Sequence, residues 1–260
     1  MTLHPDWLAP DWGLPRVGAL MTTRAGGGSV APFDSMNLRD GLGDDPAAVA
    51  GNRQRLARAL GGARAVFLNQ VHGAAVVRLG GEHAEPGTPL PLADACVTTE
   101  AGIACAVQVA DCLPVLFVAA EGRAVAAAHA GWRGLACGVL EATVVAMCES
   151  AHCTPGEVRA WLGACIGPNR FEVGADVLQA FGADPAHAAP DRFRRIRPAK
   201  WLANLPMLAR DRLREAGVTQ VSGGGWCTAE EVSRFFSFRR DRITGRMVAA
   251  VWIRPLAQGG

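Results

Sequence analysis

Two apolar runs, residues 115–120 and 124–128, flank the short turn Glu121-Gly122-Arg123, and this pattern constrains the fold more than any other. Two β-compatible runs around a glycine-containing turn are typical of a β-hairpin. Folding the chain back about Gly122 places Cys112, just before the first run, beside His129, just after the second. A thiol and an imidazole at one end of a hairpin predict a chemical site, either a metal centre or a thiol–imidazole pair.

The organisation of the chain favours one domain. Its 260 residues, half of them hydrophobic, are enough to bury a large core. Strands and helices alternate without a steady βαβ rhythm, which predicts an α+β fold in which mixed β-sheets pack with helices. No repeat, linker or low-complexity tract divides the sequence. We therefore expect a single domain over residues 1–260, with residues 1–20 as an N-terminal extension.

Charge and hydropathy exclude several classes of partner. The formal net charge is only +2, and the basic clusters 192–197 and 239–242 are short and interrupted, so no nucleic-acid partner is expected. The longest apolar region, 103–130, contains charged residues and predicts buried sheet rather than a membrane span. Residues 1–15 lack the pattern of a signal peptide, so we expect a cytoplasmic protein.

Periodicity and end signals predict the individual elements. Helices are expected over 47–60, 134–150, 176–182 and 205–216. Strands are expected over 65–71, 75–79, 104–110, 160–166 and 247–253. Residues 235–237 are expected to lie at the end of a further strand.

The eight cysteines do not indicate a disulfide framework. Without an export signal, reduced thiols are the default, and most of them stand among apolar residues as small hydrophobes. The sequence has no Cys-x-x-Cys pair, which argues against a zinc ribbon or finger.

Two of the six histidines differ from the rest because each follows a strand-like run and precedes a small residue. These are His72 and His129, which together with Cys112 make a candidate metal site. Two imidazoles and one thiolate suit Zn²⁺, and three protein ligands leave the fourth position open for water or substrate.

Two other interpretations of these residues remain open. Cys112 is a candidate thiolate nucleophile with His129 as its base. A His₂Cys set also suits type-1 copper, although such a site usually adds an axial Met. Six histidines without a His-x-His pair cannot supply the further copper cluster of a true multicopper oxidase.

The segment 131–134 opens a helix beside the candidate site and offers free backbone N–H groups to an anion. Arg133, Arg24 beside the glycine-rich loop 26–29, and Arg53 are candidates to bind phosphate. Three aromatic side chains are candidates to stack on a planar substrate: Trp132, Phe171 and Phe236.

With these residues in place, the chain resembles the YfiH-type laccase-domain family between about residues 21 and 253. The most specific matching segments are Gln70-Val71-His72-Gly73, Ala110-Asp111-Cys112-Leu113-Pro114 and His129-Ala130-Gly131-Trp132-Arg133-Gly134. Further matches are Thr22-Thr23-Arg24, Met36-Asn37-Leu38, Gly43-Asp44-Asp45, Asn52-Arg53, Gly163-Ala164-Cys165-Ile166-Gly167-Pro168, Cys227-Thr228, the segment 235–241 and Thr244-Gly245-Arg246.

The resemblance implies an α+β fold that is distantly similar to the catalytic domain of cytotoxic necrotizing factor toxins. It implies zinc, with copper as the alternative, on His72, Cys112 and His129. The activity that it implies is phosphorolysis of adenosine, inosine, guanosine and methylthioadenosine, together with adenosine deamination at the same site. For that activity Arg24, Arg53 and Arg133 are expected to hold phosphate, and Asn37 and Gln70 to position the nucleoside.

Alternatives to this activity follow from other labels given to the family. They are an amidase that edits peptidoglycan precursors and a copper-dependent polyphenol oxidase. The residues themselves leave open a non-enzyme alternative, a binding module in which the metal staples the fold and the arginines form a docking surface. The expected partners are small molecules, and the expected state is a monomer or homodimer. The chain departs from many relatives at Asn169-Arg170-Phe171, where these carry Cys and Tyr, and it contains no Tyr at all.

Overall fold

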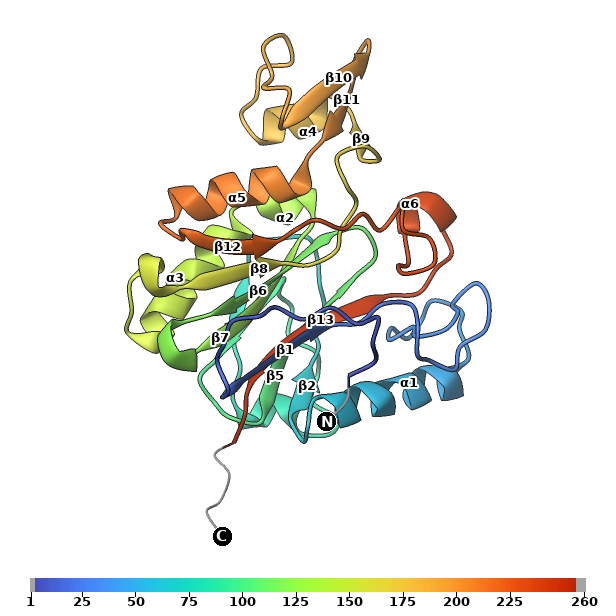
Figure 1. Cartoon of the computed structure of the whole chain (residues 1–260), viewed down its shortest axis with the longest axis vertical. Helices are drawn as coiled ribbons and strands as arrows, with labels where there is room; N and C mark the ends of the chain where they lie inside the picture. The colour runs from blue at the N-terminus through green and yellow to red at the C-terminus, as the bar shows by residue number, and fades with distance from the viewer. Residues whose placement is uncertain (1–2, 256–260) are drawn as a thin grey trace.

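Two mixed β-sheets form the body of the protein, and a third, smaller sheet projects from one end (Figure 1). The computed structural model describes residues 3–255. The largest sheet has the order β12-β8-β6-β7-β4-β3, with β3 (Val76–Arg78), β4 (Ala95–Thr98), β6 (Leu113–Val118), β7 (Val125–Ala130), β8 (Arg159–Leu162) and β12 (Gln220–Gly223).

The second sheet has β13, the last strand within residues 3–255, in its interior. Its order is β1-β13-β5-β2, with β1 (Val17–Met21), β2 (Arg64–Val66), β5 (Ile103–Val109) and β13 (Met247–Ile253). In Figure 1 the blue β1 and the red β13 run side by side. The projecting antiparallel sheet has the order β10-β11-β9, with β9 (Glu172–Val173), β10 (Phe193–Arg197) and β11 (Lys200–Ala203).

Helices cover the outer faces of the two sheets, so the described residues form one α+β domain, as the sequence predicts. Leu56 and Leu60 pack the first helix against the four-stranded sheet, while Leu140, Val144 and Leu213 pack two others against the six-stranded sheet. The six α-helices of the described region are α1 (Pro46–Ala59), α2 (Trp132–Ala136), α3 (Val139–Ala151), α4 (Ala175–Ala180), α5 (Leu205–Glu215) and α6 (Phe238–Asp241).

The predicted hairpin is confirmed as β6 and β7. The two strands pair antiparallel from Leu113 opposite Ala130 to Val118 opposite Val125, and Pro114 lies opposite His129. Every residue of both strands is buried, because one face of the hairpin packs on helices and the other on the second sheet. This double burial explains why the region reads as a nearly continuous apolar run.

The structure corrects the helix predicted over 134–150. Gly138 adopts a left-handed conformation with φ +90°, which ends α2 and lets α3 start in a new direction. The segment 235–237 forms no strand; instead the Ser237 hydroxyl accepts a hydrogen bond from the Arg240 N–H and caps α6. β1 begins at Val17, inside the segment expected as an N-terminal extension.

Within residues 3–255, no helix combines the length and the apolar character that crossing a membrane requires.

Candidate metal centre

His72, Cys112 and His129 come together at one end of the six-stranded sheet, as the hairpin predicts for the last two. Their ligand atoms all lie within 4.8 Å of one another, and within residues 3–255 they are the one such group of His, Cys, Asp or Glu found. The Cys112 Sγ is 3.8 Å from the His72 Nε2, and the two imidazole rings meet edge to face, with centroids 4.8 Å apart. His129 is buried and His72 is exposed, so the group opens to solvent on one side.

Asp94 orders both histidines from a fully buried position just before β4. Its carboxylate accepts hydrogen bonds from three successive backbone N–H groups, those of Val71 (3.1 Å), His72 (2.9 Å) and Gly73 (2.7 Å). These bonds hold His72 at φ +62°, a conformation that non-glycine residues rarely adopt. The same carboxylate lies 2.8 Å from the Nδ1 of His129, which leaves the Nε2 of that ring free for a ligand.

The charges of the group favour a thiolate on Cys112. Burial alone raises the pKa of a thiol, but hydrogen bonds from His129 and His72 outweigh it and lower the Cys112 pKa from 9.0 to about 6. Burial likewise opposes the charged form of His129, yet Asp94 and Cys112 raise its pKa from 6.5 to about 9. A thiolate is the form that binds metal, so this donor set fits a metal ion.

Glycines give the start of α2 its close approach to the group. A Cβ on Gly131 would lie 3.0 Å from both the Cys112 Sγ and the His72 Cδ2. A Cβ on Gly134 would lie 2.7 Å from the Gly73 carbonyl oxygen. α2 itself is only five residues long, so the anion site expected at its N-terminus has little helix behind it.

Two cavities meet at the metal group. We call the first, of about 270 Å³, the aromatic cavity; it is lined by His72, Ala110, Asp111, Cys112, Trp132, Arg133, Ile166, Phe171, Leu205, Phe238, Arg239 and Arg242. We call the second, of about 340 Å³, the arginine cavity; it is lined by Arg39, Leu42, Gln70, His72, Gln108, Val109, Ala110, Cys112, His129, Phe238 and Arg246. Both cavities share the wall formed by His72, Ala110, Cys112 and Phe238.

Two of the predicted binding residues lie at these cavities. Arg133 lines the aromatic cavity, with its guanidinium carbon 4.4 Å from the centre of the Trp132 ring. Gln70 lines the arginine cavity, where its amide donates to the Gln108 carbonyl (2.9 Å) and accepts from the Gln108 N–H (2.8 Å). These two hydrogen bonds to the backbone fix the Gln70 side chain against β5.

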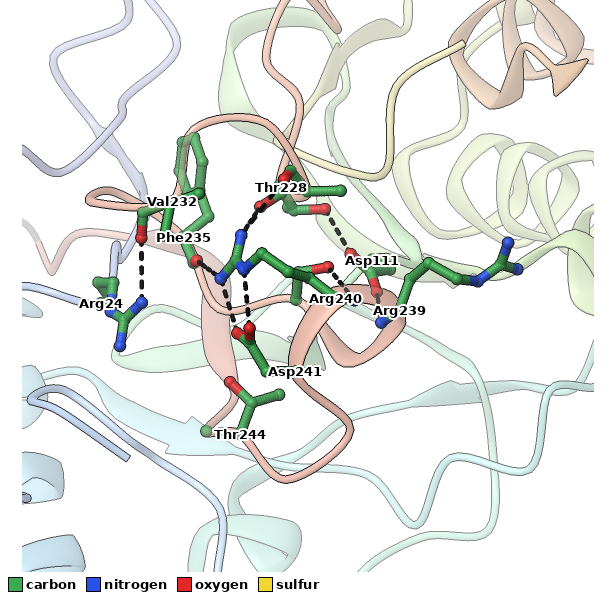
Figure 2. A network of polar contacts seen from close by, with 12 residues as sticks. Arg24, Asp111, Thr228, Val232, Phe235, Arg239, Arg240, Asp241 and Thr244 are labelled. Carbon is green, nitrogen blue, oxygen red and sulfur yellow. Dashed lines mark hydrogen bonds and ion pairs between the residues drawn. The ribbon is translucent and has the colours of Figure 1, made fainter. Parts of the chain in front are cut away.

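Three other predicted binding residues lie outside both cavities. Arg24 pairs with Asp34 at 3.0 Å and donates to the Val232 carbonyl, a contact that Figure 2 shows. Arg53 pairs with Asp40 at 2.7 Å, and Asn37 is fully buried. The predicted stacking residue Phe236 is also fully buried and lies beneath Arg24. These positions argue against direct contact of the four residues with a substrate at the metal group.

Asp111 is a site residue that the sequence reasoning missed. It has φ +94°, and its carboxylate accepts from the Thr228 hydroxyl and the Arg239 N–H, both at 2.6 Å (Figure 2). The segment that it holds is ordered further by Arg240, which donates to the carbonyls of Thr228 and Phe235. Asp111 thereby joins the residue before Cys112 to the segment that carries Phe238 and α6.

Four further residues of the site were not predicted from the sequence: Arg39, Arg246, Phe238 and Asp94. The sequence signal for Asp94 is a single acidic residue at the start of an apolar strand, which is a rare place for an unpaired charge. Arg246 belongs to a segment already noted for its family resemblance, but nothing in its spacing relates it to the metal group. Arg39 gives no local signal.

Comparison with known proteins places the chain among named relatives. The family model described as multi-copper polyphenol oxidoreductase laccase matches residues 18–254. A purine nucleoside phosphorylase of Pseudomonas aeruginosa is 48% identical over 249 residues, which cover 95% of this chain and 98% of the relative. Purine nucleoside phosphorylase YfiH of Escherichia coli (strain K12) is 45% identical over 248 residues, with 95% and 98% covered.

Solved structures show the same fold. The crystal structure of a Neisseria meningitidis protein assigned to DUF152 is similar with a TM-score of 0.87 at 45% sequence identity, and the match covers 96% of this chain and 100% of that one. The chain belongs to the YfiH (DUF152) family of laccase-like domains.

Proposed function

We propose that the protein is a zinc-dependent purine nucleoside phosphorylase for adenosine, inosine, guanosine and methylthioadenosine, and that the same site deaminates adenosine. One observation carries the proposal: two cavities meet at the metal group, and His72, Ala110, Cys112 and Phe238 line both of them. Phosphorolysis needs two reactants in contact, a nucleoside and phosphate, and such a site lets each enter its own cavity. The names of the relatives support the same activity.

Zinc fits the donors better than copper does. Two imidazoles and a thiolate match zinc, whereas a type-1 copper site usually adds an axial Met, and neither cavity is lined by one. A zinc ion held by His72, Cys112 and His129 would act as a Lewis acid, able to polarise a substrate group and to promote the ionisation of water. The group supplies three protein ligands, His72, Cys112 and His129, and opens to solvent on one side. Structural zinc sites are usually closed by four protein ligands, so this arrangement favours a catalytic ion.

In the proposed reaction an oxygen of hydrogen phosphate bonds to C1′ of the ribose. The C1′–N9 bond breaks, its electron pair passes to the purine, and the proton of hydrogen phosphate ends on the base. The products are free purine and ribose 1-phosphate, or 5-methylthioribose 1-phosphate when the substrate is methylthioadenosine. The rings of Trp132, Phe171 and Phe238 in the lining of the aromatic cavity suit the flat base.

The test incubates the zinc-loaded protein with adenosine, inosine and methylthioadenosine, with and without phosphate, and separates the products by chromatography. We expect release of free base that depends on phosphate, and inosine from adenosine. Cys112→Ser should lose zinc and both activities, whereas the exposed Cys137→Ser should keep them. Absence of both products would overturn the proposal, and cleavage of a peptidoglycan precursor or oxidation of a polyphenol instead would identify its replacement.

A further inference from the structure

Arg39 and Arg246 line the arginine cavity without a carboxylate partner. The guanidinium of Arg246 donates only to the neutral carbonyls of Thr244 (2.9 Å) and Gly245 (3.1 Å). That of Arg39 makes neither a hydrogen bond nor an ion pair with any side chain or backbone group of residues 3–255. By contrast, the nearby Arg53 is neutralised by Asp40.

The lining of this cavity offers no negative group other than the metal ligand Cys112. It contains neither Asp nor Glu among the described residues. Burial and then the positive charge of Arg39 disfavour the charged form of Arg246, and together they lower its pKa. Two like charges in a half-buried cavity destabilise a protein unless an anion enters between them.

A buried amide fixes the two arginines relative to one another. The Oδ1 of Asn37 accepts from the backbone N–H of Arg39 (3.1 Å) and from that of Arg246 (3.0 Å). Its Nδ2 donates to the Arg39 carbonyl (3.1 Å) and to the Asp44 carboxylate (2.8 Å). The backbones of both arginines are therefore set before any ligand arrives, which reduces the entropy cost of binding.

We infer that Arg39 and Arg246 form the subsite for inorganic phosphate. The inference deepens the proposed function and rests on it for the identity of the second reactant. Two guanidinium groups match the two charges of hydrogen phosphate, and their paired N–H donors suit its oxygens. Because His72 and Cys112 line both cavities, a phosphate bound there and a nucleoside in the aromatic cavity would meet at the metal group.

The test measures binding of inorganic phosphate to the zinc-loaded full chain by calorimetry, and in parallel the KM for phosphate and for inosine. Arg39→Gln should weaken phosphate binding and raise its KM by about 10- to 100-fold, as expected for loss of charged hydrogen bonds, with the KM for inosine nearly unchanged. Arg39→Lys, which keeps the charge but not the paired donors, should fall between. The matched control is Arg58→Gln on the exposed side of α1, which should behave as the wild type. Arg246→Gln should repeat the Arg39 result where it folds with full zinc content.

Each outcome separates the subsite from the activity. If Arg39→Gln binds phosphate as tightly as the wild type, the inference that Arg39 belongs to the phosphate subsite is wrong, even if the wild-type protein cleaves nucleosides with phosphate. Phosphate binding that depends on Arg39, in a protein that cleaves no nucleoside, supports the subsite and overturns the proposed function. A wild-type protein that binds no inorganic phosphate overturns the subsite, and tight binding of inosine 5′-monophosphate in that case assigns the arginines to a nucleotide instead.

Discussion

Replacing Asp94 with Asn should damage the fold and the metal centre together. One carboxylate oxygen accepts from the His72 N–H and lies 2.8 Å from the His129 Nδ1, and the other accepts from the N–H groups of Val71 and Gly73. An amide puts an NH₂ group in place of one oxygen, so two of these four contacts are lost. At about 1.5–3 kcal/mol for each hydrogen bond to a charged group, the loss is about 3–6 kcal/mol of the free energy of unfolding.

The metal centre should respond in either orientation of the new amide. With its nitrogen toward Val71 and Gly73, the loop that holds His72 at φ +62° loses its anchor. With its nitrogen toward His129, the ring is driven into the tautomer whose proton lies on Nε2, which cannot bind a metal. Loss of such a supporting carboxylate typically weakens metal binding by about 10- to 100-fold.

Urea unfolding of the metal-free protein measures the first effect, and competition with a chromophoric chelator measures the second. Asp184→Asn is the matched control, since Asp184 lies 2.7 Å from the Nδ1 of His187 in the same kind of pair, but on the exposed surface. We expect no measurable change in that variant. A destabilisation of Asp94→Asn below about 1 kcal/mol, with unchanged zinc affinity, would refute the reasoning.

Three further predictions concern other parts of the structure. Gly131→Ala should lower zinc affinity by more than tenfold (about 1.4 kcal/mol or more), because the new Cβ would press on Cys112 and His72. The stability of the metal-free protein should change little. Equal zinc affinity of the variant and the wild type in a chelator competition would contradict this. In the metal-free protein, alkylation of Cys112, followed by peptide mass spectrometry, should rise through pH about 6, since the two histidines lower its pKa below that of an ordinary thiol, and zinc should suppress it; a midpoint near pH 9 would be inconsistent. Hydrogen bonds from Arg192 lower the pKa of Asp211, so the stability that this pair contributes is present above the unfolded carboxyl pKa of about 4 and is lost as pH falls through the lower folded value. The difference in Tm between wild type and Asp211→Asn should therefore shrink between about pH 4 and pH 2. A difference that stays constant over this range would disprove the linkage.

What could be predicted from the sequence is what neighbouring residues encode. The hairpin followed from two apolar runs around Gly122, and its pairing alone brought Cys112 and His129 to one end. The α+β class followed from the mixed order of elements. The break between α2 and α3 at Gly138 was not predicted, because a single glycine is tolerated within a helical pattern. Only the packing of the folded protein requires Gly138 to turn the chain.

The remaining parts of the site depend on contacts between distant segments. Arg39 and Arg246 lie in separate loops and meet only because Asn37 binds both backbones. Arg24 has the glycine-rich neighbours of a ligand-binding residue, but Asp34 takes up its charge. β10 was not predicted because four of its five side chains are exposed and three of these are Arg, so no alternating apolar pattern marks it. β11 alternates between half-buried and buried residues, but a run of four residues is too short to show this period in the sequence.

The central place of β13 bears on how the chain is made. β13 separates β1 from β5 and is synthesised after every other strand of residues 3–255, so β1 has no neighbouring strand in its sheet until then. Until synthesis passes residue 253, the hydrogen-bonding edges of β1 and β5 that pair with β13 stay open to water and to other nascent chains. We expect the newly made protein to rely on holding chaperones during this interval, and to aggregate when translation stalls before residue 247.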